Sequence, residues 1–123
     1  MKQEDAQPPW DLRDRTLEYA SSVVSAFVRL PKSEVASVLG KQMLRSGTSV
    51  GSQYREGHRA KSINDKISKL EGALQELEET TYWIELLGRH QFLPPETANP
   101  LQDETNQLTA ILVTIVTKLK RGR

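Results

Sequence analysis

Several residue types and segments are missing from this sequence, and each absence narrows the range of functions. It contains no cysteine, which excludes a disulfide scaffold, a zinc site with thiolate ligands and a cysteine nucleophile. No apolar run approaches the ~18 residues that a membrane span requires. The first nine residues, MKQEDAQPP, lack the apolar core of a secretion signal. These absences predict a soluble, cytoplasmic protein that does not associate with a membrane.

Aromatic residues and net charge are also scarce. Aromatic residues make up 6% of the chain and the formal net charge is +1, so overall charge indicates no particular partner. The chain has 123 residues, of which 37% are hydrophobic and 27% are charged. This length and composition are typical of one globular domain. We therefore expect a flexible, polar tail over residues 1–10 and one domain over residues 11–121.

The first half of this domain has the apolar spacing of two helices. The first helix is expected over residues 12–30 and ends before Pro31. Its apolar stripe, at steps of three and four, is Leu17, Ala20, Val24 and Phe27. Ser33 is the candidate N-cap of a second helix over residues 34–57. The stripe of that helix is Val35, Leu39, Met43, Ser46, Val50 and Tyr54. Glycines interrupt it, each at a cost of roughly 1 kcal/mol relative to alanine.

The second half contains two more helical patterns. Ser62 is expected to open a third helix that runs to residue 89. Its stripe is Ile63, Ile67, Leu70, Leu74, Leu77, Thr81 and Ile84. Asn99 and Pro100 resemble the N-cap and first residue of a fourth helix. The stripe of that helix is Leu101, Thr105, Leu108, Leu112, Ile115 and Leu119. Short connections favour antiparallel neighbours, so the predicted fold class is all-α, an up-down-up-down antiparallel four-helix bundle.

Charge is distributed unevenly along the chain. Residues 41–69 carry a net charge of +5, residues 70–104 carry −7 and residues 105–123 carry +4. One interpretation is a solvated surface with ion pairs between helices, each worth at most about 1 kcal/mol. The other is a basic patch near the connection between the second and third helices, facing phosphates or an acidic partner. The candidate nucleic-acid-binding residues of that patch are Arg55, Arg59, Lys61, Lys66 and Lys69.

Motifs for catalysis or metal binding are weak. Residues 47–51 match the G-x-S-x-G pattern of a nucleophile elbow, but that elbow requires a strand before the serine, and no strand is expected. A di-iron site in a helical bundle uses Glu-x-x-His motifs, and neither His58 nor His90 has a glutamate three residues before it. We therefore expect no catalytic residue, no metal site and no cofactor, and infer that the protein is not an enzyme.

A second face of the third helix, beside its apolar stripe, is a candidate interface. Glu76, Thr80 and Trp83 lie on it at steps of four and three. We expect Arg45 on the second helix to form an ion pair with Glu76 or Glu79. The glycines at 47 and 51, one turn apart, would let another backbone approach closely. Either subunits meet here or the face belongs to a wide intramolecular core. The candidate subunit-interface or helix-packing residues are Arg45, Gly47, Gly51, Glu76, Glu79, Thr80 and Trp83.

Several of these segments, in matching order, resemble one protein family. They are R-S-G-T-S-V-G at residues 45–51, Y-R-E at 54–56, S-K-L at 68–70, Glu76, E-T at 79–80 and Y-W at 82–83. The chain resembles the four-helix-bundle proteins encoded in intervening sequences of bacterial 23S ribosomal RNA genes, over residues 11–120. That family includes the accessory variability determinant of diversity-generating retroelements.

The resemblance implies a homopentameric assembly of up-down bundles. For the retroelement members it also implies binding to a reverse transcriptase and to nucleic acid through a basic surface, and it implies no catalytic residue. The first hypothesis is therefore a non-enzymatic, homo-oligomeric module associated with RNA. The alternative is a protein–protein adaptor or scaffold without nucleic-acid binding. Salt dependence of RNA binding separates the two, because phosphate contacts make affinity fall with rising salt.

Overall fold

Four helices account for most of residues 11–123, which are the residues that the computed structural model describes. Their bounds are α1 Leu12–Val28, α2 Glu34–Arg59, α3 Ile63–Arg89 and α4 Pro95–Gly122. No strand occurs within this part of the chain, so the predicted all-α class is confirmed. The prediction of a flexible tail over residues 1–10 falls outside the described residues.

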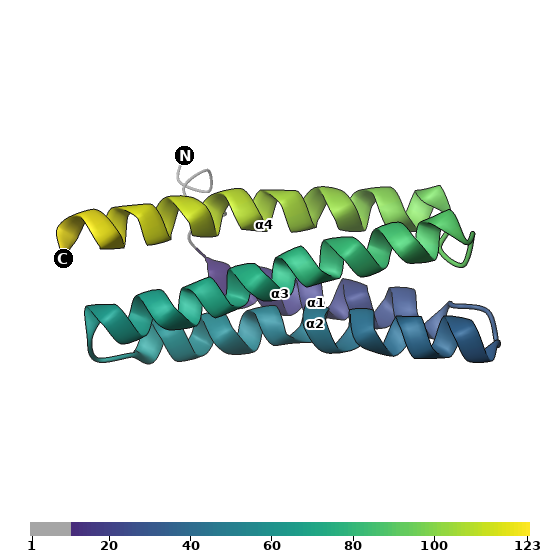
Figure 1. Cartoon of the computed structure of the whole chain (residues 1–123), viewed down its shortest axis with the longest axis horizontal. Coiled ribbons are helices and arrows are strands. Elements are labelled where there is room, and N and C mark those ends of the chain that lie inside the picture. Colours follow the sequence, from purple (N-terminus) through teal and green to yellow (C-terminus); the bar gives the residue numbers. More distant parts are fainter. Residues whose placement is uncertain (1–10) are drawn as a thin grey trace.

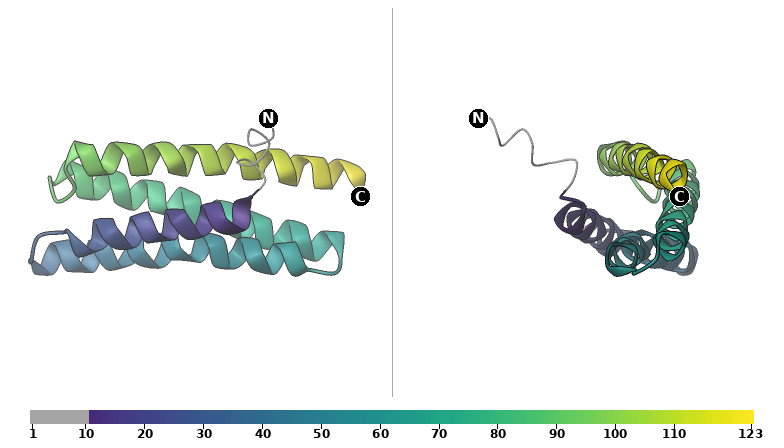
Figure 2. Two further views of the ribbon diagram at one scale, coloured as in Figure 1. Left: turned by 180° about the vertical axis from the view of Figure 1, so that it is seen from behind. Right: turned by 90° about the vertical axis from the view of Figure 1, so that its left-hand side faces the viewer.

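The helices lie side by side and alternate in direction along the chain (Figure 1). Seen along the bundle, they follow one another around an arc, with α1 and α4 at its two ends (Figure 2). The most extensive contact is between α2 and α3, and the contact between α1 and α4 is the least extensive of the neighbouring pairs. The molecule is therefore an antiparallel bundle whose centre is the α2–α3 pair.

Serine side chains fix the starts of the two central helices. The Oγ atom of Ser33 accepts a hydrogen bond from the backbone N–H of Ala36, at 3.0 Å. The Oγ atom of Ser62 accepts one from the N–H of Asp65, also at 3.0 Å. Each bond satisfies a backbone donor that has no partner inside the first helical turn. Both N-caps confirm the sequence prediction and set where α2 and α3 begin.

The apolar stripe predicted for the first helix is wrong. Leu17 and Val24 are 54% and 43% exposed, whereas the buried face of α1 is Leu12, Thr16, Tyr19, Val23 and Ala26. An apolar stripe does not reveal this face, because it includes the polar residue Thr16. Its hydroxyl donates to the carbonyl of Leu12 at 2.6 Å, which lets the side chain enter the core without an unsatisfied donor.

The predicted start of the fourth helix is also wrong. We expected Asn99 and Pro100 to open it, but α4 begins at Pro95 and contains Pro100. Proline favours the first helical position, and in α4 that position is taken by Pro95 and not by Pro100. Pro100 lacks the N–H that would bond to the carbonyl of Glu96. Both residues are exposed, so water can satisfy that carbonyl in the first turns of α4.

Polar side chains join the two ends of the arc. The hydroxyls of Tyr19 on α1 and Thr105 on α4 are hydrogen-bonded at 2.7 Å inside the core. Burial is the largest of the effects that raise the pKa of Tyr19 to about 12. Near the surface, the Arg15 guanidinium binds both carboxylate oxygens of Glu104, at 2.7 and 2.9 Å. These bonds hold α1 against the first half of α4.

Candidate nucleic-acid interface

The five residues of the predicted basic patch lie around the connection between α2 and α3. Arg59, Lys61 and Lys69 are exposed, and Arg55 and Lys66 are partly buried. The Lys69 ammonium is 2.9 Å from a carboxylate oxygen of Glu56, so a nearby acid offsets part of its charge. The structure thus brings the five cations to one end of the bundle, as their places in the sequence suggest.

The end of α4 brings further cations to the same end of the bundle (Figure 1). The Arg123 guanidinium donates to the side-chain carbonyl of Asn64 at 3.0 Å, and the Lys120 ammonium is 2.6 Å from a carboxylate oxygen of Glu71. We call this surface the basic end and define it by Arg55, Arg59, Lys61, Lys66, Lys69, Lys118, Lys120, Arg121 and Arg123. Sequence reasoning treated the C-terminal cations separately, although alternating helices place the ends of the second and fourth together.

A surface hollow lies beside the basic end, between the start of α1 and the end of α2. Its volume is about 200 Å³, and it is lined by Arg13, Tyr54, Arg55, His58 and Arg59. One Nη atom of Arg55 donates to the backbone carbonyl of Arg13 at 3.4 Å. The rings of Tyr54 and His58 are stacked with centroids 5.9 Å apart. Sequence reasoning missed Arg13, Tyr54 and His58 as parts of one site.

The glycines at 47 and 51 face α1 within the same chain. A Cβ atom built on Gly47 would lie 2.7 Å from a methyl carbon of Val23. One built on Gly51 would lie 3.0 Å from the hydroxyl of Thr16. Real Cβ atoms essentially never approach another atom to 2.7 Å, so a side chain at residue 47 would force a shift, whereas one at residue 51 would need Thr16 to move by only a few tenths of an ångström. The close approach expected at these glycines is therefore a contact between α1 and α2.

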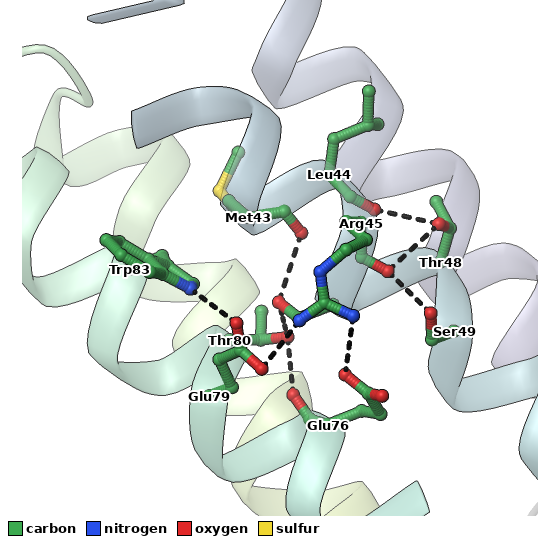
Figure 3. Close-up of polar contacts among 10 residues, drawn as sticks. Met43, Leu44, Arg45, Thr48, Ser49, Glu76, Glu79, Thr80 and Trp83 are labelled. Atoms are coloured by element: carbon green, nitrogen blue, oxygen red, sulfur yellow. Dashed lines mark hydrogen bonds and ion pairs between the residues drawn. The ribbon is translucent and has the colours of Figure 1, made fainter. Parts of the chain in front are cut away.

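Arg45 forms the ion pairs that the sequence suggested (Figure 3). Its guanidinium lies 2.7 Å from Oε1 of Glu79 and 3.6 Å from Oε1 of Glu76. The other carboxylate oxygen of Glu79 accepts from the indole N–H of Trp83 at 3.1 Å. Hydrogen bonds from Arg45 and then Trp83 lower the pKa of Glu79. The stabilisation is therefore present above the usual pKa of a glutamate and is lost as pH falls through the lowered value.

Thr80 lies beneath this ion pair, inside the contact between α2 and α3. Its hydroxyl is hydrogen-bonded to that of Ser46 at 2.7 Å, and both residues are fully buried. This bond and the ion pairs of Arg45 with Glu76 and Glu79 join α2 to α3 within one chain. A role for the seven predicted interface residues between subunits stays a prediction.

In the described part of the chain, the residues of the remaining sequence motifs are not arranged for catalysis or metal binding. Ser49, the serine of the G-x-S-x-G match, lies inside α2 and donates to the carbonyl of Arg45 at 2.7 Å. It therefore has the geometry of a helical serine and not that of a strand-to-helix elbow. No group of three His, Asp or Glu residues among 11–123 is arranged to hold a metal ion. Over the same residues, no helix combines the length and apolarity needed to cross a membrane.

The similarity of this chain to known proteins covers most of the four helices. A family model described as 23S rRNA-intervening sequence protein matches residues 11–114. A crystal structure of a protein with unknown function from the S23 ribosomal protein family, from Bacteroides thetaiotaomicron, has a TM-score of 0.80 and 36% sequence identity. The similarity covers 85% of this chain and 96% of that one. A comparison with curated proteins gives no match.

Proposed function

We propose, from the premise that this chain belongs to the 23S rRNA-intervening sequence protein family, that it is a non-enzymatic, homo-oligomeric module that associates with RNA. The observation that carries the proposal is the basic end, where α2, α3 and α4 contribute cations to one surface. A net charge of +1 for the whole chain gives little general attraction to phosphates. Concentration of the cations at one end supplies a local attraction instead.

Among the described residues, glutamates form ion pairs with only some of the cations at the basic end. In the described residues, Lys69 and Lys120 form ion pairs with glutamates, whereas Arg59 and Lys61 are exposed and form none. Exposed, unpaired cations are available to phosphates, and each phosphate contact releases a counterion from the RNA. We therefore assign the main RNA contacts to Arg59, Lys61 and their unpaired neighbours.

Charge reversal at the basic end is expected to weaken RNA binding and its dependence on salt. Arg59→Glu with Lys61→Glu removes two phosphate contacts, so the slope of log affinity against log salt should become shallower by about two units. The measurement is fluorescence anisotropy with a structured RNA over a salt series. The matched control is Lys32→Glu with Arg89→Glu, which makes the same charge change at exposed residues of the opposite end. Equal affinities for the two double variants would contradict the proposal.

An exposed apolar stripe on α1 supports self-association. Leu17, Val24 and Val28 are 54%, 43% and 70% exposed, and they lie on a different face of α1 from its buried residues. A second copy of the chain would remove this stripe from water. A ring would also repeat the basic end around one rim, and weak sites joined on one scaffold gain avidity without new contacts. Five subunits, as the family resemblance implies, is the proposed number.

Light scattering is expected to give a mass several times that of the 13.9 kDa chain. Val24→Glu should shift this mass toward the monomer, because it places a charge in a buried apolar contact. Ser25→Glu, an added charge at the adjacent exposed residue, serves as the control and should leave the mass unchanged. A wild-type mass near that of one chain at micromolar concentration would rule out an obligate ring.

The same stripe on α1 also favours a second candidate function, that of a protein–protein adaptor. An oligomer that keeps its mass but binds no RNA at low salt would support the adaptor over the RNA module. A reverse transcriptase partner, which the resemblance implies for retroelement members, stays a prediction.

A further inference from the structure

We propose that the hollow between α1 and α2 binds one nucleotide of single-stranded RNA. The phosphate would lie on the guanidiniums of Arg13, Arg55 and Arg59, and the base would stack on His58. This inference rests on the proposed association with RNA and identifies where and how a nucleotide is bound. It involves residues on two helices that the predicted basic patch did not combine.

The arginines of the hollow are free to bind a phosphate. Among residues 11–123, none of Arg13, Arg55 and Arg59 forms an ion pair, whereas Arg15 and Arg45 do. The bond from Arg55 to the carbonyl of Arg13 uses one of the five N–H groups that a guanidinium carries. It also orients Arg55 across the gap between the helices. Planar guanidiniums with unused donors are well suited to phosphate oxygens.

The aromatic pair gives the hollow a platform for a base. Tyr54 is partly buried and His58, one turn later, is exposed. Their rings are inclined by 24° to each other, so Tyr54 supports one side of the imidazole. The pKa of Tyr54 is raised, chiefly by burial and also by the nearby charge of Asp11. Stacking on such a ring is tolerant of base identity, so we expect little sequence preference.

The size and charge of the hollow favour this ligand over an enclosed small molecule. Its volume of about 200 Å³ is below the ~300 Å³ at which small-molecule pockets begin. A nucleotide within a strand needs only a surface recess, because its neighbours lie outside. The charge of Asp11 acts on Tyr54 in the hollow, and the three guanidiniums that line the hollow outweigh this carboxylate.

The test uses three labelled strands of equal length in anisotropy measurements: oligoadenylate, oligouridylate and an abasic strand. Arg13→Gln should weaken binding of all three by at least about fivefold and make the salt slope shallower by about one unit. This change leaves intact the Arg13 carbonyl that accepts from Arg55. His58→Ala should weaken the binding of oligoadenylate by about fivefold or more and leave the binding of the abasic strand nearly unchanged. Unchanged melting temperatures verify that both variants are folded.

Lys61→Gln is the matched control, because Lys61 lies at the basic end but outside the hollow. It should weaken the binding of all three strands by the same factor. The difference in affinity between oligoadenylate and the abasic strand should therefore stay as in wild type. If Arg13→Gln binds as wild type while structured RNA still binds, the hollow is not the site and the proposed function survives. If His58→Ala affects oligoadenylate and the abasic strand equally, the stacking assignment is wrong. If no RNA binds wild type at low salt, the proposed function itself fails.

Discussion

Gly47→Leu is expected to lower the free energy of unfolding by about 3 kcal/mol or more, at the upper end of what overpacking costs. A Cβ atom at residue 47 would lie 2.7 and 2.8 Å from the two methyl carbons of Val23. Val23 is fully buried, so its side chain cannot move out into solvent to make room. Relief therefore requires α1 to shift away from α2, which opens the core along both helices.

Urea denaturation measures this effect, and Gly88→Leu is the control. Gly88 is also helical, but a Cβ atom there would meet no heavy atom within 4 Å. The same substitution should therefore stabilise the protein by up to about 1 kcal/mol, because leucine favours a helix more than glycine does. A denaturation midpoint for Gly47→Leu equal to that of wild type would show that α1 and α2 are not in close contact.

Tyr19→Ala is expected to cost about 3–5 kcal/mol, the usual range for removing a large buried aromatic side chain. Tyr19 is 1% exposed, and its hydroxyl is bonded to Thr105 on α4. Removal leaves a cavity at the contact between the two ends of the helical arc. Thr105 keeps its bond to the carbonyl of Leu101, at 2.7 Å, so the loss arises mainly from the cavity.

The matched control is Tyr82→Ala, the same substitution at a tyrosine that is 56% exposed. Its ring touches Trp83 edge-on with centroids 4.9 Å apart, so we expect a loss of no more than about 1 kcal/mol. Thermal or urea unfolding of both variants gives the comparison. Similar losses at the two tyrosines would mean that α1 does not bury the face containing Tyr19.

Helix positions were predictable where local chemistry decides them. The caps at Ser33 and Ser62 depend on a hydroxyl and a backbone N–H three residues away, which the sequence alone displays. The buried face of α1 was not predictable in this way. Two stripes lie side by side on that helix, and the choice between them depends on which one α2 and α4 cover. Thr16 and Tyr19 enter the core because their hydroxyls find partners there.

The candidate site shows the same division. The ion pair of Arg45 with Glu79 follows from two antiparallel helices whose charged residues are in register. The hollow does not follow from local pattern, because Arg13 and Arg55 are separated by 42 positions in the chain. Their meeting depends on where α1 begins relative to the end of α2. Only the packed structure sets that offset.

The order of the helices around the arc has a consequence for how the chain folds. Each extensive contact joins helices that are consecutive in the sequence, and the contact between α1 and α4 is much less extensive than these. The bundle is therefore a succession of helical hairpins, with low contact order, and its topology favours rapid folding. Each hairpin can form on the preceding one, so the helices can assemble in turn as the chain leaves the ribosome.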